Sequence, residues 1–136
     1  VIGGRGSIGG SMVDILKKAK NCESIVSTSR DAAFVNAPTK SDNVRRFQLD
    51  PTCEKSYSDL VKRLQDEQFK PNFIFNAVGM LHQNLNEADK IKPETSFKKI
   101  SKNSLAASFE ANLVTNGLAL RYLLGDLCVK KEPGVF

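Results

Sequence analysis

The sequence is poor in the residues that build covalent or metal-held scaffolds. It has three cysteines and one histidine among its 136 residues. Cys22, Cys53 and Cys128 lie far apart, and their odd number and wide spacing match neither a disulfide framework nor the ligand pairs of a zinc site. We therefore expect no metal site, and we expect a reducing compartment, the cytoplasm.

Long apolar runs are also missing. No stretch approaches the roughly 20 residues that a membrane span needs, so we expect no membrane partner. The net charge is +5, but no aromatic residues are interleaved with basic ones, and we expect no nucleic-acid partner. We interpret the local excess of lysine as a solvated surface. It comprises Lys90, Lys92, Lys98, Lys99 and Lys102.

The length suits one domain with one core. Val1 and Ile2 resemble the last residues of a buried strand, and residues 134–136 resemble the beginning of another. A strand usually has about five residues. We therefore expect residues 1–136 to be a single domain that lacks the start of its first strand and everything after the beginning of its fifth.

Apolar periodicity predicts strands that alternate with helices. The expected strands after the first cover residues 24–28, 44–49 and 72–76, with a fifth from 134. The expected helices run from Ser7 to Lys20, from an N-cap at Thr52, and from Ser104 onward. This alternation predicts an α/β fold, a doubly wound parallel (Rossmann) sheet that binds its ligand at the carboxyl ends of the strands.

Each expected helix carries an apolar stripe that we expect to face the core. In the first helix it comprises Ile8, Met12, Ile15, Leu16 and Ala19. In the second it comprises Tyr57, Leu60, Val61 and Leu64. In the helix from Ser104 it comprises Leu105, Phe109, Leu113, Leu120, Leu124 and Leu127.

A glycine-rich turn follows the first strand. Gly4-x-Gly6-x-x-Gly9 has the spacing of the dinucleotide fingerprint, in which glycines let the backbone approach a diphosphate and the helix N-terminus supplies N–H donors. A mononucleotide P-loop is set aside because Gly10 stands where its lysine belongs. A strand-to-helix turn that merely needs glycine is the alternative. The expected cofactor contacts in this loop are Gly3, Arg5, Gly6, Ser7, Ile8 and Gly9.

The end of the second strand indicates which dinucleotide is bound. Ser29 lies twenty positions after Gly9, where an acidic residue would bind the ribose 2′-hydroxyl of NAD. A serine hydroxyl followed by the guanidinium of Arg30 suits the 2′-phosphate of NADP instead. Arg5 is placed to close on the same phosphate. The alternative is that Arg30 is an ordinary surface arginine, but its place at a strand end favours NADP (NADPH).

Two further strand ends carry candidate cofactor contacts. Asp50 can accept a hydrogen bond from the adenine amino group, or cap the helix that follows it. After the next strand come Asn76, Ala77, Val78 and Gly79. Gly79 would let the cofactor lie against the backbone, and Asn76 would brace neighbouring strands. Taken alone, this sequence is an ordinary turn.

These motifs, in this order, resemble the N-terminal half of the short-chain dehydrogenase/reductase family. That family has an N-A-x-G sequence after its fourth strand, as residues 76–79 have here. Its long helix carries an asparagine in a setting like residues 109–113, so the resemblance implies that Asn112 is the catalytic asparagine that holds a water in the proton relay. Residues 79–82 are similar to the branch of small carbonyl reductases related to C-factor.

The glycine loop departs from the usual family pattern. The family's G-x-x-x-G-x-G has Ser7 in place of its middle glycine here. The spacing of Gly3, Gly6 and Gly9 is instead the one seen in extended and atypical relatives.

The family's catalytic serine and its Tyr-x-x-x-Lys pair are not found. Val61 lies four residues after Tyr57, and Asp126 lies four residues after Tyr122, so neither tyrosine supplies the pair. The only histidine, His82, suits acid–base chemistry in principle. Because nothing nearby orients it, we interpret it as a loop residue beside the substrate entrance.

The resemblance implies an NADP-dependent oxidoreductase that transfers a hydride between the nicotinamide and a small carbonyl or alcohol substrate. One alternative is an extended relative that acts on a nucleotide sugar, and another is an NADP-binding sensor or scaffold without catalysis. The helix from Ser104 resembles the one through which relatives pair, so we expect a homo-oligomer. We also expect Asn112 on the inner face of this helix, near Gly79 and away from solvent.

Overall fold

The computed structural model describes residues 1–38, 41, 43–79 and 100–128. Its centre is a pair of parallel strands, β1 (Ile25–Ser29) and β2 (Val44–Gln48). Ile25 lies opposite Val44 and Ser29 lies opposite Gln48. Both strands are confirmed, with bounds that differ by one residue at β1 and at the end of β2 from those expected.

Two more segments extend this pair into a wider sheet. The Gly4 N–H donates to the Thr28 carbonyl at 2.9 Å. On the other side, the Ile2 N–H donates to the Phe75 carbonyl at 2.8 Å, and the Ile2 carbonyl accepts from the Ala77 N–H at 3.0 Å. The order across the sheet is therefore residues 44–48, 25–29, 1–4 and 75–77. This is the 3-2-1-4 order of the doubly wound fold, which confirms the predicted fold class.

The expected fourth strand is the least regular part of the sheet. Residues 72–76 form a single parallel bridge, between Ile2 and Asn76. Phe73 is 57 % exposed, so this apolar segment is not buried on both faces. Within the described residues this segment hydrogen-bonds to the sheet only along its side next to Ile2, which leaves Phe73 without cover.

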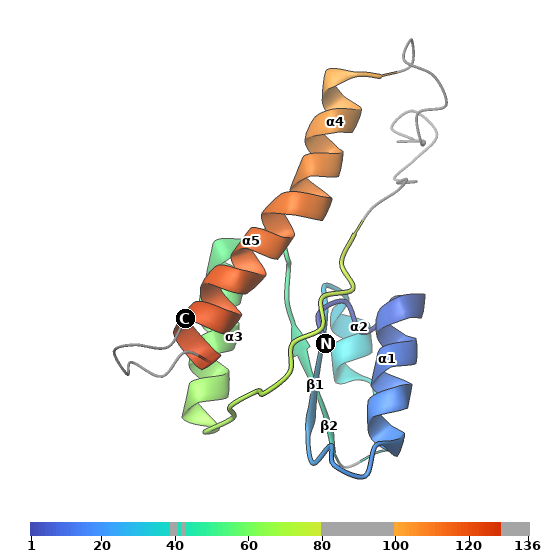
Figure 1. Ribbon diagram of the computed structural model, residues 1–136, viewed down its shortest axis with the longest axis vertical. Helices are drawn as coiled ribbons and strands as arrows, with labels where there is room; N and C mark the ends of the chain where they lie inside the picture. Colours follow the sequence, from blue (N-terminus) through green and yellow to red (C-terminus); the bar gives the residue numbers. More distant parts are fainter. Residues whose placement is uncertain (39–40, 42, 80–99, 129–136) are drawn as a thin grey trace.

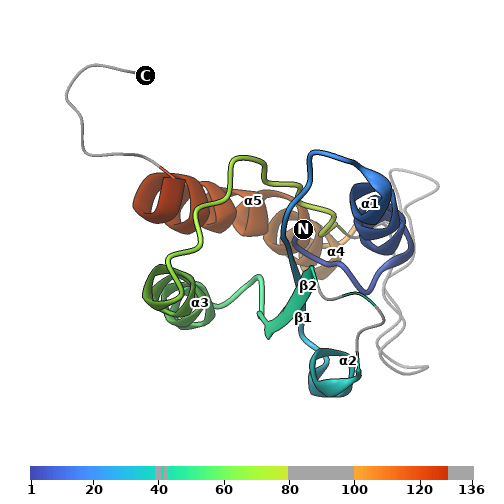
Figure 2. The ribbon, with the colours of Figure 1, turned by 90° about the horizontal axis from the view of Figure 1, so that it is seen from below.

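Helices lie on both faces of the strands (Figures 1 and 2). α1 (Ser7–Lys18) and α2 (Ala32–Asn36) pack on one face. α3 (Glu54–Asp66) and one long helix pack on the other. The long helix consists of α4 (Lys102–Phe109), the π-helical segment η2 (Glu110–Val114), α5 (Thr115–Ala119) and a second π-helical segment, η3 (Leu120–Cys128).

Tyr57 is the centre of the larger core cluster, between α3 and the long helix. Its side chain is fully buried, and its ring stacks on Tyr122 with the ring centroids 5.8 Å apart. Its hydroxyl donates to the Thr115 carbonyl at 3.3 Å. The predicted stripe of α3 is confirmed, since its four members are all buried. They are Tyr57, Leu60, Val61 and Leu64.

The long helix buries a different face from the one expected. Thr115, Ala119 and Leu123 are buried in it, because the flat ring of Tyr57 leaves room only for small side chains at the closest approach. The expected stripe is exposed instead, apart from Leu127, which is partly buried. Its exposed members are Leu105, Phe109, Leu113, Leu120 and Leu124.

The packing of α1 also corrects the sequence prediction. The helix ends at Lys18 and not at Lys20. It buries Gly9 and Val13, whereas Ile8 and Ile15 are exposed. Glycine at the point of closest approach brings the start of α1 against the backbone of the first strand, so the helix turns its smaller side chains inward.

Helix starts differ from the expected ones because of local capping. The long helix begins at Lys102, where Ser101 and Ser104 form a reciprocal capping box. The N-cap of α3 is Cys53 and not Thr52. The short helix α2 was not expected. It begins after Asp31, whose carboxylate accepts a hydrogen bond from the Ala33 N–H at 2.9 Å.

Alkaline pH should destabilise the fold through Tyr57. Burial, and to a smaller extent the charge of Asp50, raises the pKa of Tyr57 to about 12, against about 10 in an unfolded chain. Between these values the folded protein binds more protons than the unfolded one, so the free energy of unfolding should fall as pH rises, by up to about 3 kcal/mol. Urea unfolding from pH 9 to pH 12 measures this slope. Tyr57→Phe should make the slope shallower, and an unchanged slope in that variant would contradict the assignment.

Candidate cofactor site

The glycine loop is bent so tightly that glycine is required at two positions. Gly3 has φ +77°, in the left-handed region that glycine enters without strain. A Cβ on Gly9 would lie 2.3 Å from the carbonyl oxygen of Gly3. Because that contact is with backbone, no side-chain rotation could relieve it. The loop therefore brings bare backbone up to the start of α1, whose N-cap is Gly6.

The turn after the fourth strand meets this loop. A Cβ on Gly3 would lie 3.2 Å from Cγ2 of Val78 and 3.5 Å from the carbonyl carbon of Ala77. The turn is held by Asn76, whose Oδ1 accepts from the Val78 N–H at 3.0 Å. The structure thus brings the glycine loop and residues 76–79 together at the carboxyl edge of the sheet, where α/β sheets bind nucleotides.

An amide chain connects this edge to the long helix. Asn76 Nδ2 donates to Asn116 Oδ1 at 2.8 Å, and Asn116 Nδ2 donates to the Asn112 carbonyl at 2.7 Å. The expectation that Asn76 braces neighbouring strands is therefore corrected, since its amide side chain braces a helix. Sequence reasoning missed Asn116, although its spacing of four residues from Asn112 places both on one face of a helix.

Asn112 lies beside Gly79, as expected, but it is more open to solvent than expected. Its Oδ1 lies 3.1 Å from the position that a Cβ on Gly79 would take. Its Nδ2 donates to Ser108 Oγ at 3.1 Å. The residue is exposed, so the prediction that it points away from solvent is wrong. It lies in the π-helical segment η2, and such segments are frequent at functional sites.

The end of β1 carries a hydrogen-bonded turn. Ser29 is 9 % exposed, and its Oγ accepts from the Asp31 N–H at 3.1 Å. The carbonyl of Arg30 accepts from Gln48 Nε2 at 3.1 Å, and the Arg30 side chain is exposed. These contacts fix the backbone of the turn that carries Arg30 and leave its side chain in solvent.

Arg5 is paired with an acidic residue of this turn, Asp31. Its Nε forms an ion pair with Asp31 Oδ2 at 3.2 Å. The Arg5 side chain is 63 % exposed and that of Asp31 is 33 % exposed. Sequence reasoning missed Asp31, and the signal for it was its place two residues after Ser29, immediately before a run that forms a helix.

Asp50 supports the turn that leads into α3. Its Oδ1 accepts from the Thr52 N–H at 3.0 Å and from the Thr52 hydroxyl at 2.8 Å. Its own N–H donates to Ser56 Oγ at 2.9 Å. This contact pattern favours the structural role of Asp50 over the adenine contact, although it is not the N-cap.

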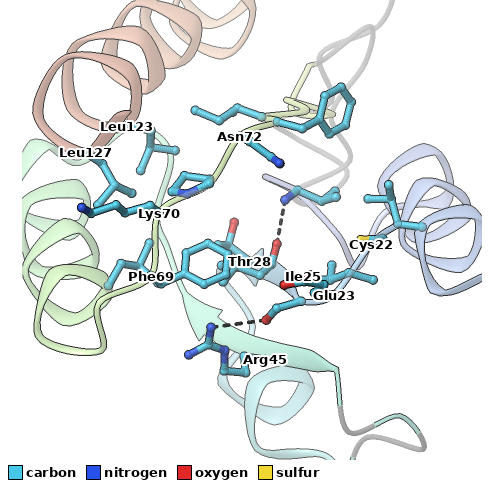
Figure 3. A pocket seen from close by; sticks show the side chains of 18 of the residues that line it. Cys22, Glu23, Ile25, Thr28, Arg45, Phe69, Lys70, Asn72, Leu123 and Leu127 are labelled. Carbon is cyan, nitrogen blue, oxygen red and sulfur yellow. Dashed lines mark hydrogen bonds between the residues drawn. The ribbon is translucent and has the colours of Figure 1, made fainter. Parts of the chain in front are cut away.

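A large cavity lies elsewhere in the described residues. It has a volume of about 660 Å³ and opens at the amino ends of the strands, opposite the glycine loop. Figure 3 shows Cys22 and Ile25 on one side of it and Phe69, Leu123 and Leu127 on the other. Because this lining lacks the glycine loop, we do not place the cofactor here.

The remaining sequence predictions concern metals, membranes and His82. In the described ranges, no group of histidine, cysteine and acidic side chains could hold a metal ion. None of the described helices is both long and apolar enough to cross a membrane. His82, most of the lysine-rich segment and the expected fifth strand lie outside the described residues.

No protein-family model and no curated protein matches this chain. Solved structures do match it. The Sniffer protein of Caenorhabditis elegans, assigned as a carbonyl reductase, matches 92% of this chain with 50% of its own, at a TM-score of 0.69 and 23% identity. A Leptospira borgpetersenii short-chain dehydrogenase with bound NAD+ matches 91% of this chain with 43% of its own, at a TM-score of 0.69 and 18% identity. A 4-hydroxyisoleucine dehydrogenase complexed with NADH and succinate matches 92% of this chain with 50% of its own, at a TM-score of 0.63 and 16% identity.

These matches establish the fold. The chain spans about half the length of the solved structures it matches. Its parallel sheet and flanking helices have the same fold as the matching part of these dehydrogenases.

Proposed function

We propose that this chain is the cofactor-binding part of a short-chain dehydrogenase/reductase that uses NADP. The observation that carries the proposal is the meeting of the glycine loop with the N-A-x-G turn, where Gly3 lies against Val78. We call this meeting of the glycine loop with residues 76–79 the cradle. A Cβ on Gly9 would overlap the Gly3 backbone, so glycine at this position lets the loop fold tightly and offer bare backbone to a ligand. The fold shared with dehydrogenases supports the same conclusion.

The cradle would hold the diphosphate, and its two ends would hold the rest of the cofactor. The start of α1 offers N–H groups that have no partner within the helix, together with the positive end of the helix dipole. Ser29 and Arg30 would contact the 2′-phosphate of the adenosine half. Two of the solved neighbours hold NAD+ or NADH, and the selection of NADP by this chain rests on these two residues.

When bound, the nicotinamide would give a hydride to a carbonyl carbon of the substrate or take one from an alcohol carbon. Asn112, beside Gly79 in the structure, is the residue of this chain that we assign to the chemistry. It would hold a water between the reacting centre and solvent, in the manner the family resemblance implies. Asn76 and Asn116 would position it through the amide chain.

Neither tyrosine of this chain suits the proton donor. A catalytic tyrosine needs a lowered pKa, whereas burial raises the pKa of Tyr57 to about 12. A hydrogen bond to the Glu54 carboxylate raises the pKa of Tyr122. Both also pack between α3 and the long helix, away from the cradle. We therefore assign neither tyrosine as the proton donor of the proposed reductase.

We further propose that the protein pairs with a second copy through the long helix. Leu113, Leu120 and Leu124 form an exposed apolar stripe on it, each more than 40 % exposed. A stripe of this kind on one helix face marks an interaction site in soluble proteins.

We propose a small carbonyl or alcohol as the substrate. The cytoplasm is the proposed location, in keeping with the free thiols of Cys22 and Cys53.

Titration of the full-length protein with NADPH and NADH tests this function. NADPH should bind more tightly, because a charge-assisted phosphate contact contributes about 1.5–3 kcal/mol. Arg30→Ala should weaken NADPH about 10-fold or more and leave NADH nearly unchanged. Equal affinities in the unchanged protein would remove Arg30 from its role. Binding of both cofactors without carbonyl-dependent oxidation of NADPH would instead favour a sensor or scaffold.

A further inference from the structure

We propose that Asp31 determines how strongly this site selects a phosphate-bearing cofactor. In the free protein its carboxylate holds Arg5, one of the two cations at the 2′-phosphate position, and it lowers the positive charge there. The inference rests on the proposed function, because it concerns the same adenosine end of the cradle. Asp31 is then a specificity-determining residue that acts against the phosphate contacts of Ser29 and Arg30.

The carboxylate of Asp31 is held by a contact at each oxygen. Oδ2 lies 3.2 Å from Arg5 Nε, and Oδ1 accepts the Ala33 N–H at 2.9 Å. The backbone N–H of Asp31 donates to Ser29 Oγ at 3.1 Å. The group is therefore fixed by both neighbouring turns, and it cannot swing away from the site without losing the cap of α2.

The charges at this end of the site show what the carboxylate does. Arg5 and Arg30 supply two positive charges, and Asp31 removes one of them. A 2′-phosphate carries a nearly doubly negative charge, so it must compete with Asp31 for Arg5 and is also repelled by the carboxylate. The adenosine of NADH bears only a hydroxyl at that position and meets neither penalty. The effect of Asp31 should thus fall on NADPH and spare NADH.

Asparagine is the informative replacement at this position. Its side-chain oxygen caps a helix about as well as that of aspartate, so the Ala33 contact and α2 should persist. The negative charge is lost, and Arg5 becomes free to bind a phosphate oxygen. The two functions of Asp31, capping and charge, are separated in this way.

The test measures the dissociation constants of NADPH and NADH for the full-length protein and its variants by titration calorimetry. Asp31→Asn should tighten NADPH about 10-fold, which corresponds to about 1.4 kcal/mol, and change NADH less than about 2-fold. Asp14→Asn is the matched control, because it removes an equal charge from an exposed ion pair of α1, that of Asp14 with Lys17 at 3.1 Å. It should leave both constants unchanged.

A double-variant cycle tests whether the effect passes through Arg5. In an Arg5→Ala background, Asp31→Asn should tighten NADPH less than about 3-fold, since only the repulsion remains to be relieved. A fall in NADH affinity in Asp31→Asn would overturn the inference, because Asp31 would then bind the ribose hydroxyl. Equal tightening by Asp14→Asn would reduce the effect to overall charge and would also overturn it. If no variant binds either cofactor while all unfold cooperatively, the proposed function itself fails.

Discussion

Gly9→Ala should abolish cofactor binding, lowering the affinity of the full-length protein for NADPH by at least about 100-fold. The added Cβ would lie 2.3 Å from the Gly3 carbonyl oxygen and 2.8 Å from its carbonyl carbon. Since both atoms are backbone, the loop itself must move. Its movement would displace the N–H groups that the diphosphate needs, and forced overpacking of this kind also costs about 1–3 kcal/mol of stability. Titration with NADPH and urea unfolding measure the two effects.

Gly117→Ala is the matched control for this prediction. A Cβ on Gly117 would meet no atom within 4 Å, and alanine is the better helix former by about 1 kcal/mol. This variant should be at least as stable as the unchanged protein and bind NADPH equally well. If Gly9→Ala bound NADPH as tightly as Gly117→Ala does, the cradle would be misplaced.

Asn112→Ala should lower kcat for carbonyl reduction by about 100-fold or more, the range of an acid–base relay. The variant removes the amide that lies beside Gly79 but keeps the helix, because alanine is a good helix former. KM and the affinity for NADPH should change by less than about 3-fold, since the amide acts on the proton and not on cofactor binding. Steady-state kinetics of the full-length protein separate these quantities.

Asn103→Ala is the control for the loss of an amide from the same long helix. Asn103 is exposed in α4, and Asn112 lies farther along the same long helix, in the π-helical segment η2. Its replacement should leave kcat unchanged. A value of kcat for Asn112→Ala that equals the control would end the catalytic assignment and leave Asn112 as part of the Asn76–Asn116 amide chain.

The elements that depend on local pattern could be predicted from the sequence. β1, β2 and α3 lie within one or two residues of the expected ranges, because their apolar spacing is regular and turn residues bound them. The glycine loop was also predictable, since the left-handed φ of Gly3 and the contact of Gly9 with Gly3 leave no other residue possible.

The choice of buried face could not be predicted. Leucine spacing alone pointed to Leu113 and Leu120 in the long helix, but burial there is decided by Tyr57 on α3, which requires the small Thr115 and Ala119 beside it. A stripe of large apolar residues is equally what a pairing surface requires. Tertiary packing therefore overrides the pattern at this helix.

Contacts between distant parts of the chain could likewise not be predicted from the sequence. The ion pair of Arg5 with Asp31 spans 26 positions, and the bond of Asn76 with Asn116 spans 40. Such pairs arise only when the loops at the carboxyl ends of the strands converge. The other site residues could be identified one by one from motifs in the sequence. Asp31 and Asn116 are identified only by the residues that they contact in the structure, Arg5 and Asn76.

The most direct test of the account is to observe which backbone groups meet the cofactor. Residues 1–136 contain nine glycines, so selective ¹⁵N-glycine labelling of the full-length protein reports on the loop, the turn and the long helix at once. On addition of NADPH, the account predicts shifts of the amide signals of Gly3, Gly6, Gly9 and Gly79, with those of Gly117 and Gly125 unmoved. Saturating NADPH that leaves the loop signals in place, or that shifts the helix glycines alone, would contradict the claim that this cradle holds the dinucleotide.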